Sequence, residues 1–212
     1  MHWFGNWFVK ITGWILHVFV YKKKIYYEDK KVQSRKIKGR AIIVSNHTSV
    51  WDYPLMMYVF SGRTLRCQIA ELMFEKSIFL TFVLKWIGAI RVDRKGHDFS
   101  FMVKSEKILS KNGVVLVYPE SKIPKEGEER PLPFKPSVVY TALNTDTKII
   151  PVFTNGSYFS KQRTRVIIGK PLDLKDFYDD SLDESTNLDV ISKKLRNEII
   201  RLGNELNEKI KN

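Results

Sequence analysis

The sequence holds very little cysteine, which argues against both a disulfide and a metal site built on cysteine. Cys67 is the only cysteine among 212 residues, so no disulfide can form within the chain and a reducing, cytoplasmic compartment is permitted. The four histidines are His2, His17, His47 and His97. They show no zinc-type spacing with one another or with Cys67, so we expect no metal site. Cys67 itself lies in an apolar stretch and is interpreted as a small core residue.

Acidic residues are scarce as well. The chain has 23 Asp and Glu against 36 Lys and Arg, which gives a formal net charge of +13. The excess is uneven, because residues 1–40 hold ten basic and two acidic residues whereas residues 173–212 hold seven and ten. A basic N-terminal end suits an anionic surface, which either nucleic acid or anionic lipid could supply.

The chain has no internal repeat and no stretch that is typical of a linker between domains. Hydrophobic residues make up 43% of the sequence, enough for one domain with a substantial core. Prolines, a glycine and mixed charges collect between residues 121 and 136. Such a loop is either a lid or binding loop beside a site or a solvated connection, and the sequence leaves both open.

Apolar runs and their spacing predict the regular elements. We expect strands at residues 41–45, 65–70, 89–92, 114–118, 149–153 and 165–168. We expect helices at residues 53–60, 73–86, 99–110, 137–143 and 188–210. The last helix has an apolar stripe that most simply packs on the domain. Strands that alternate with helices favour a single α/β domain.

An N-H-x-x-x-x-D motif stands between the first strand and the first of these helices. His47 and Asp52 can meet only across the turn that joins the two elements, and open α/β sheets place their sites at such junctions. A histidine whose far nitrogen donates to a carboxylate is a better base, which suits removal of a proton from a hydroxyl. Two plainer interpretations stay open. Ser49 to Asp52 fits a helix capping box, and a lone histidine after a strand is often structural.

At this motif the sequence resembles the glycerophospholipid acyltransferase superfamily, and most closely the bacterial 1-acylglycerol-3-phosphate acyltransferases. The resemblance runs in order through four blocks, at residues 45–55, 88–94, 117–120 and 149–153. The first is similar to the family's H-x4-D motif, the second to its G-x-I-x-V-D-R, and the fourth to its apolar strand with a proline. The third block departs from the family. After Glu120 the family has Gly-Thr-Arg-Ser, whereas this chain has Ser121, Lys122 and Ile123.

The resemblance implies a single domain with a central mixed sheet flanked by helices. It also implies transfer of an acyl chain from an acyl thioester to the free hydroxyl of lysophosphatidic acid, which yields phosphatidic acid. His47 would be the general base and Asp52 its orienting acid. Acyl-CoA or acyl carrier protein would bring the acyl chain as a co-substrate, and no cofactor is expected. A serine acyl-enzyme on Ser45 or Ser49 stays open, although no G-x-S-x-G elbow is present.

The blocks contain further candidates for substrate binding, which are Asn46, Arg91, Arg94, Glu120 and Lys122. Both arginines stand at a predicted strand end, where guanidinium groups could hold the acceptor phosphate, and the resemblance favours Arg94. Either arginine could instead pair with Asp93 or face solvent, and Glu120 could form a structural ion pair. Lys122 can supply a positive charge but cannot make the bidentate hydrogen bonds of an arginine. Pro151 marks the acyl-donor region by resemblance, although core packing explains it equally well.

The first twenty residues have a strongly apolar helical pattern. On a 3.6-residue period one narrow polar stripe remains, made of Asn6, Lys10, Gly13 and His17. The candidate anchor residues are Trp3, Trp7, Trp14, Lys22, Lys23 and Lys24. Tryptophans followed by lysines are typical of a helix at a membrane interface. Eighteen residues are about the lower limit for a span, and Lys10 would then lie within the bilayer, so we expect a monotopic or peripheral anchor.

We therefore predict an anchor over residues 1–24 and a catalytic domain over residues 25–212, at the cytoplasmic face of the cell membrane. The lysines would keep the N-terminal helix at the cytoplasmic face by attraction to anionic lipid. The lack of a basic residue before the apolar run argues against a cleavable signal. A core helix docked on the domain is the alternative for residues 3–20.

Two other functions stay open. The altered residues after Glu120 leave room for another lysophospholipid or a hydroxylated lipid as the acceptor. A basic membrane-binding protein without catalysis is the alternative from a different class, suggested by the net charge. We expect no nucleic-acid partner, because the aromatic residues stand mainly in apolar runs and not among Lys and Arg.

Overall fold

The chain folds around one mixed β-sheet. The structure is a computed structural model that describes residues 2–93 and 98–211. Within these residues the sheet has seven strands in the order β1-β7-β6-β2-β5-β3-β4. The strands are β1 (Lys24–Tyr27), β2 (Ala41–Ser45), β3 (Leu65–Ala70), β4 (Ile90–Val92), β5 (Val114–Val117), β6 (Ile149–Thr154) and β7 (Arg165–Ile168). Neighbouring strands are parallel except for β6 and β7, so the predicted central mixed sheet is confirmed.

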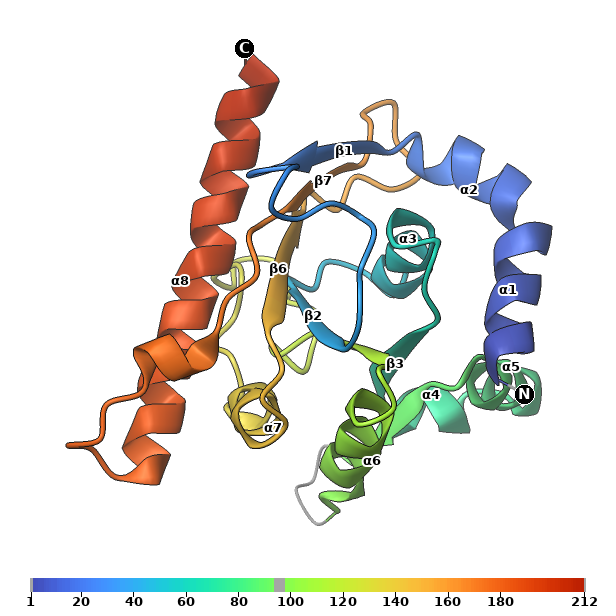
Figure 1. Cartoon of the computed structure of the whole chain (residues 1–212). Helices are drawn as coiled ribbons and strands as arrows, with labels where there is room; N and C mark the ends of the chain where they lie inside the picture. The colour runs from blue at the N-terminus through green and yellow to red at the C-terminus, as the bar shows by residue number, and fades with distance from the viewer. Residues whose placement is uncertain (1, 94–97, 212) are drawn as a thin grey trace.

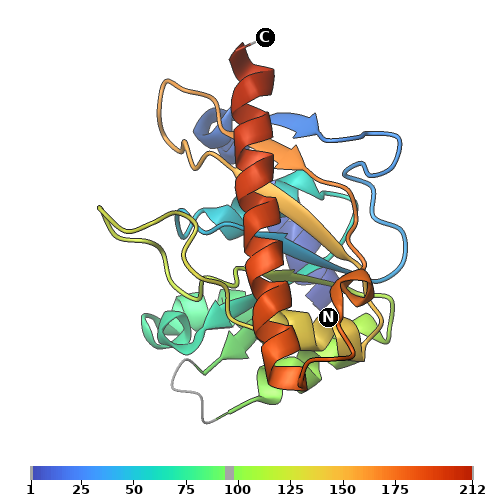
Figure 2. The ribbon, with the colours of Figure 1, turned by 90° about the vertical axis from the view of Figure 1, so that its left-hand side faces the viewer.

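Helices cover both faces of the sheet (Figures 1 and 2). One face packs against α1 (His2–Thr12), α2 (Trp14–Tyr21), α3 (Asp52–Val59) and α5 (Ile78–Ile87). The other packs against α6 (Ser100–Leu109), α7 (Ser137–Asn144) and α8 (Glu184–Lys211). Along β2, Ala41 and Ile43 join the first core and Ile42 and Val44 join the second. Because alternate side chains face opposite layers, a strand buried on both faces is apolar throughout.

The longest helix confirms the stripe predicted at the C-terminal end. Buried positions of α8 include Ile191, Leu195, Ile199, Leu202 and Leu206. The helix lies against β6 and β7 and runs along the whole sheet in Figure 2. Its apolar stripe therefore packs on the domain.

The other predicted strands and helices are found within a few residues of their expected bounds, with three differences. Strand β1 was not predicted, because its sequence is short and half polar and it lies at the sheet edge beside β7. The helix expected at residues 73–86 is two helices, α4 (Glu71–Glu75) and α5, since Ser77 has an extended backbone (φ −163°).

The third difference is that the N-terminal helix is divided into α1 and α2. The division falls at Gly13, where a Cβ atom would lie 2.5 Å from the Tyr58 hydroxyl and 2.9 Å from the Val9 carbonyl oxygen. Glycine therefore lets the chain approach α3 closely where the helix direction changes.

No helix in the described part of the chain has the length and apolar character needed to cross a membrane.

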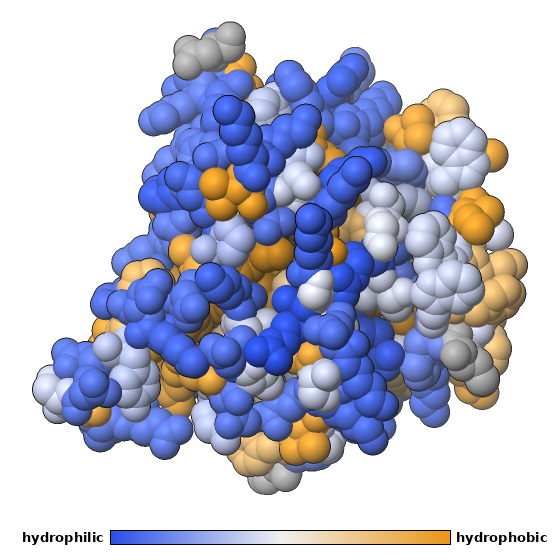
Figure 3. Space-filling model, in the orientation of Figure 1, coloured by the Kyte–Doolittle hydropathy of each residue, from blue (hydrophilic) through white to orange (hydrophobic). Residues whose placement is uncertain are grey.

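The polar stripe of the N-terminal helices faces the domain. Asn6 donates to the carbonyl of Leu65 at 3.3 Å, and Lys10 donates to the carbonyls of Ser61 and Arg63 at 3.1 and 2.6 Å. His17 stacks on Tyr58 with ring centroids 3.9 Å apart. The apolar sides consequently face outward, and hydrophobic side chains gather at the edge of Figure 3 where Figure 1 places α1 and α2. The separation into an anchor of residues 1–24 and a domain of residues 25–212 stays a prediction.

Lys10 should make stability depend on pH. Burial lowers its pKa from 10.5 to about 8. Between these values the unfolded chain still binds the proton that the folded protein has released, so the stability contributed by Lys10 rises with pH. We expect wild type to gain about 2 kcal/mol relative to Lys10→Met between about pH 7.5 and 9.5 in denaturant unfolding. A pH-independent difference between the two proteins would contradict this.

Candidate functional site

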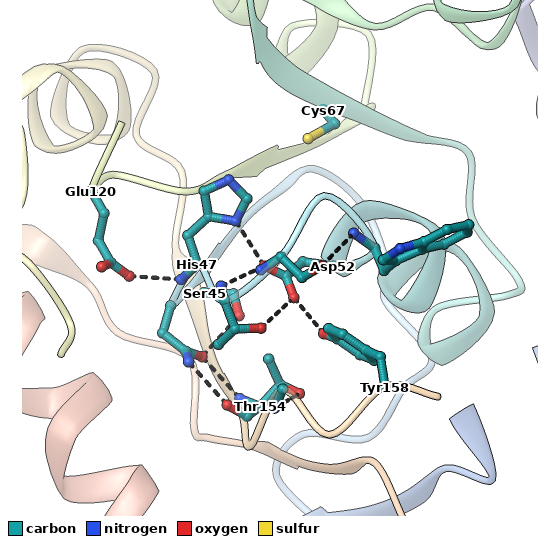
Figure 4. A network of polar contacts seen from close by, with 12 residues as sticks. Ser45, His47, Asp52, Cys67, Glu120, Thr154 and Tyr158 are labelled. Atoms are coloured by element: carbon teal, nitrogen blue, oxygen red, sulfur yellow. Dashed lines mark hydrogen bonds and ion pairs between the residues drawn. The ribbon is translucent and has the colours of Figure 1, made fainter. Parts of the chain in front are cut away.

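Polar residues gather where the central parallel strands end. His47 follows β2, Glu120 follows β5, and Thr154 is the last residue of β6. Figure 4 shows one network in which the His47 side chain meets Asp52, the first residue of α3, while Glu120 meets the His47 nitrogen and Thr154 meets Asn46. The site thus lies outside the carboxyl ends of the strands, where open α/β sheets usually bind their ligands.

The two residues of the H-x4-D motif are in direct contact. His47 Nδ1 lies 2.7 Å from Asp52 Oδ2. A carboxylate accepts hydrogen bonds, so this contact assigns the proton of a neutral imidazole to Nδ1 and leaves Nε2 as its basic nitrogen. Nε2 makes no hydrogen bond with another described residue, and the histidine side chain is 17% exposed. Tyr118 stacks on the imidazole at 4.6 Å and limits how far it can turn.

Asp52 also organises the turn that brings it to His47. Its Oδ2 accepts from the backbone nitrogens of Thr48 and Ser49 at 2.7 and 2.9 Å, and its Oδ1 accepts from the Thr48 hydroxyl at 2.7 Å. The bond from the Ser49 nitrogen has the direction of a capping-box bond, but α3 begins at Asp52 with Trp51 as its N-cap and no side-chain cap hydrogen bond. One buried carboxylate therefore holds the turn before the helix and contacts His47.

Tyr158 is a site residue that sequence reasoning missed. Its hydroxyl donates to Asp52 Oδ1 from the loop that follows β6. Burial raises the pKa of this phenol, and the Asp52 charge adds to the effect, so the phenol stays protonated as a donor. Its position, 106 residues from Asp52 and beyond the fourth block, offered no local signal.

Glu120 links two segments of the backbone. Its Oε1 accepts from the His47 nitrogen at 2.6 Å, and its Oε2 accepts from the Leu132 nitrogen at 2.7 Å. The side chain is only 4% exposed. Burial raises its pKa, while the two hydrogen bonds act in the opposite direction. Glu120 therefore joins the loop at residues 121–136 to His47, and its predicted substrate contact stays a prediction.

Asn46 joins the ends of two strands. Its side-chain amide donates to the Thr154 carbonyl and accepts from the Thr154 nitrogen, both at 2.9 Å. These two side-chain hydrogen bonds continue the pairing of β2 with β6 beyond the last backbone pair, Ser45 and Val152. Pro151 lies buried in β6 beside Val44. Substrate roles for Asn46 and Pro151 stay predictions.

The predicted cationic residues lie in surface ion pairs. Arg91 is 53% exposed, with Nη2 3.2 Å from Glu75 and 3.6 Å from Glu71. Lys122 is 50% exposed, with its Nζ 2.6 Å from Glu128. Exposed ion pairs of this kind contribute little and exchange readily. The structure does not bring these residues to His47, and Arg94 lies outside the described residues.

The departure from the family after Glu120 coincides with an unusual backbone conformation. Ser121 stands where the family has glycine, and its φ of +62° is in the left-handed region that glycine adopts without cost. The usual glycine thus suits a turn that this chain makes with a serine. Among residues 2–93 and 98–211, no three His, Cys, Asp or Glu side chains are placed to hold a metal ion.

Comparison with known proteins identifies the family of this chain. The acyltransferase family profile matches residues 21–155, so the chain belongs to the acyltransferase family, as the four blocks predicted. Human 1-acyl-sn-glycerol-3-phosphate acyltransferase beta is 28% identical over 145 residues, which are 68% of this chain and 51% of that protein. A coconut (Cocos nucifera) 1-acyl-sn-glycerol-3-phosphate acyltransferase is 26% identical over 159 residues, 74% of this chain and 49% of the relative. The chain thus spans about half the length of the curated relatives it matches.

A solved structure has the same fold. The crystal structure of the 1-acyl-sn-glycerophosphate (LPA) acyltransferase PlsC from Thermotoga maritima superposes with a TM-score of 0.66. The match covers 93% of this chain and 79% of PlsC, at 17% sequence identity. The predicted α/β acyltransferase fold is confirmed.

Replacing Glu120 should destabilise the site as a whole. We expect Glu120→Gln to lower the free energy of unfolding by about 1–3 kcal/mol, because an amide cannot accept from both backbone nitrogens. Denaturant unfolding measures the loss. Glu126→Gln, at an exposed position of the same loop, is the matched control, and equal losses in the two variants would refute the structural role.

Proposed function

We propose that this chain transfers an acyl group from an acyl thioester to the free hydroxyl of lysophosphatidic acid and forms phosphatidic acid. The observation that carries the proposal is the 2.7 Å contact between His47 Nδ1 and Asp52, which leaves Nε2 as a base at the edge of the sheet. The acyltransferase family match and the names of the relatives support the choice of reaction.

The geometry suits direct transfer. His47 Nε2 takes the proton of the acceptor hydroxyl while that oxygen attacks the thioester carbonyl. The new C–O bond forms as the C–S bond breaks, and the imidazolium returns the proton to the departing thiolate. Asp52 stabilises the imidazolium and keeps the proton on Nδ1, as a carboxylate does in hydrolytic triads. Either acyl-CoA or acyl carrier protein can present such a thioester, and no cofactor enters the reaction.

The nearby hydroxyl groups favour direct transfer over an acyl-enzyme. Ser45 is fully buried, with its hydroxyl 3.4 Å from Asn46. The Ser49 hydroxyl accepts from the Trp51 nitrogen, and the Thr48 hydroxyl donates to Asp52. A nucleophile activated by His47 would instead donate to its ring nitrogen. We therefore assign His47 to activation of the acceptor.

The acceptor phosphate would be bound by cations at this edge of the molecule. Arg91 and Lys122 can exchange exposed carboxylate partners for a phosphate, and Arg94 is the further candidate. A second candidate function is the same chemistry on another lysophospholipid or a hydroxylated lipid. It is favoured by Ile123, 36% exposed, in the place of the family's arginine. A panel of acceptors in a thiol-release assay distinguishes the two.

The apolar face of α1, α2 and α5 would hold the enzyme on a membrane. Its exposed members are Trp3, Phe4, Phe8, Ile11, Trp14, Ile15, Val18, Phe19, Ile78, Phe79 and Phe82. Soluble proteins rarely leave so large an apolar surface uncovered, and aromatic residues suit the membrane interface. Trp7 is half-buried beside Trp3, with ring centroids 6.3 Å apart.

Basic residues border this face. Lys22 and Lys24 are exposed, while Lys23 contacts His17. Lys23 and Lys24 also line a hollow of about 710 Å³ with Lys30, Arg35 and Lys36. These charges would attract the anionic headgroups of a cytoplasmic membrane leaflet. The association would be monotopic or peripheral.

Loss of the base should abolish transfer without unfolding the protein. We expect His47→Ala to lower kcat/KM by roughly a hundredfold or more, the usual contribution of a general base. Thiol release from acyl-CoA with lysophosphatidic acid measures the rate, and thermal unfolding checks the fold. His2→Ala, at an exposed position, is the control. Retained activity in His47→Ala would refute the proposed function.

Membrane association can be tested on the apolar face alone. We expect Trp3, Trp14 and Phe19 changed together to Ser to weaken binding to anionic vesicles by more than about tenfold, because each buried aromatic ring contributes about 1.5–3 kcal/mol. Vesicle flotation measures binding. The control changes Val103, Tyr140 and Tyr178, which are also exposed but lie on or beside α6 and α7. Equal binding by both variants would exclude the apolar face as the anchor.

A further inference from the structure

The loop between β6 and β7, residues 155–164, connects the site with the N-terminal helices. The Phe159 nitrogen donates to the Val20 carbonyl at 3.3 Å, and the Thr164 nitrogen donates to the Tyr21 carbonyl at 2.9 Å. Both carbonyls belong to the last residues of α2. The loop is therefore bonded at two points to the helix that carries part of the apolar face.

Two neighbouring residues of this loop point in opposite directions. Tyr158 turns inward to Asp52, and its ring meets Tyr21 edge-on at 5.5 Å. Phe159 is 62% exposed and packs against Trp51 at 5.0 Å. The backbone of Phe159 is in the left-handed region (φ +53°), which is costly for a bulky residue. Such a conformation persists only where surrounding contacts hold it, and here they hold Tyr158 in place.

The hydrogen bonds of Asp52 show what Tyr158 contributes. Thr48 and Ser49 belong to the same turn as His47 and Asp52, so their bonds move together with that turn. Tyr158 is the donor that reaches the carboxylate from a different strand connection, among the described residues. Figure 4 shows it approaching Oδ1 from the side away from His47. It therefore joins the carboxylate to the loop that follows β6.

We propose that Tyr158 is a positioning residue: its hydrogen bond to Oδ1 holds the Asp52 carboxylate in the plane in which Oδ2 meets His47 Nδ1. The inference rests on the proposed function, since the orientation of His47 matters for rate only if His47 is the base. The contacts with Val20 and Tyr21 set the position of Tyr158, so the last turn of α2 supports the site although it lies outside it.

Removal of one oxygen atom tests the inference. We expect Tyr158→Phe to lower kcat about tenfold, which corresponds to about 1.4 kcal/mol of transition-state stabilisation, and to leave KM for lysophosphatidic acid within about twofold. Tyr58→Phe is the matched control, because it removes a half-buried hydroxyl that donates to the Val9 carbonyl at 3.2 Å and not to the carboxylate. Unchanged kcat in Tyr158→Phe, or an equal loss in Tyr58→Phe, would overturn the proposal.

A double-mutant cycle separates positioning from a general structural effect. In an Asp52→Ala background, Tyr158→Phe should change kcat by less than about twofold, because the group on which Tyr158 acts is gone. A full tenfold loss in that background would show that Tyr158 acts by another route. Thermal unfolding of each variant accompanies the kinetics, and the comparison with Tyr58→Phe decides the matter if Asp52→Ala does not fold. An active His47→Ala refutes the proposed function, whereas an inactive His47→Ala beside a normal Tyr158→Phe refutes this inference alone.

Discussion

The buried carboxylate of Asp52 is the constraint on which the rest of the site depends. A fully buried charge is costly unless hydrogen bonds replace its water. Donors from three places meet this need: the backbone and hydroxyl of the 48–49 turn, the imidazole of His47, and the phenol of Tyr158. Satisfying one group therefore orients the start of α3, the histidine ring and the loop after β6 together.

Parallel pairing brings the other groups to the same place. Strands β2, β5 and β6 end at one edge of the sheet, and polar side chains join their ends. Asn46 bonds to Thr154 across β2 and β6, and Glu120 bonds to the nitrogen of His47 across β5 and β2. These side-chain bonds continue beyond the ends of the strands, so His47 is held by a rigid frame although it lies in a loop.

The N-terminal helices have an inverted amphipathic arrangement. Their narrow polar stripe is inside, where Asn6 and Lys10 donate to carbonyls between the end of α3 and the first residue of β3, and their broad apolar sides are outside. A helix that packs on a soluble domain normally does the reverse. The helices are docked on the domain, as the alternative expected, and they still present an apolar outer surface. A membrane interface on that side stays a prediction.

The sequence by itself predicted most of the strands and helices and the meeting of His47 with Asp52. Apolar runs such as residues 41–44 predict a strand buried on both faces, and His47 and Asp52 lie close enough in the chain for a turn to be their only meeting point. Only the tertiary structure decided the roles of Tyr158 and Glu120, whose partners are 106 and 73 residues away. It also decided the inward direction of Lys10, the pairing of β1 with β7, and the break at Gly13. Periodicity reports which side chains avoid water, but which distant groups meet follows from strand order and register, and no local pattern encodes these.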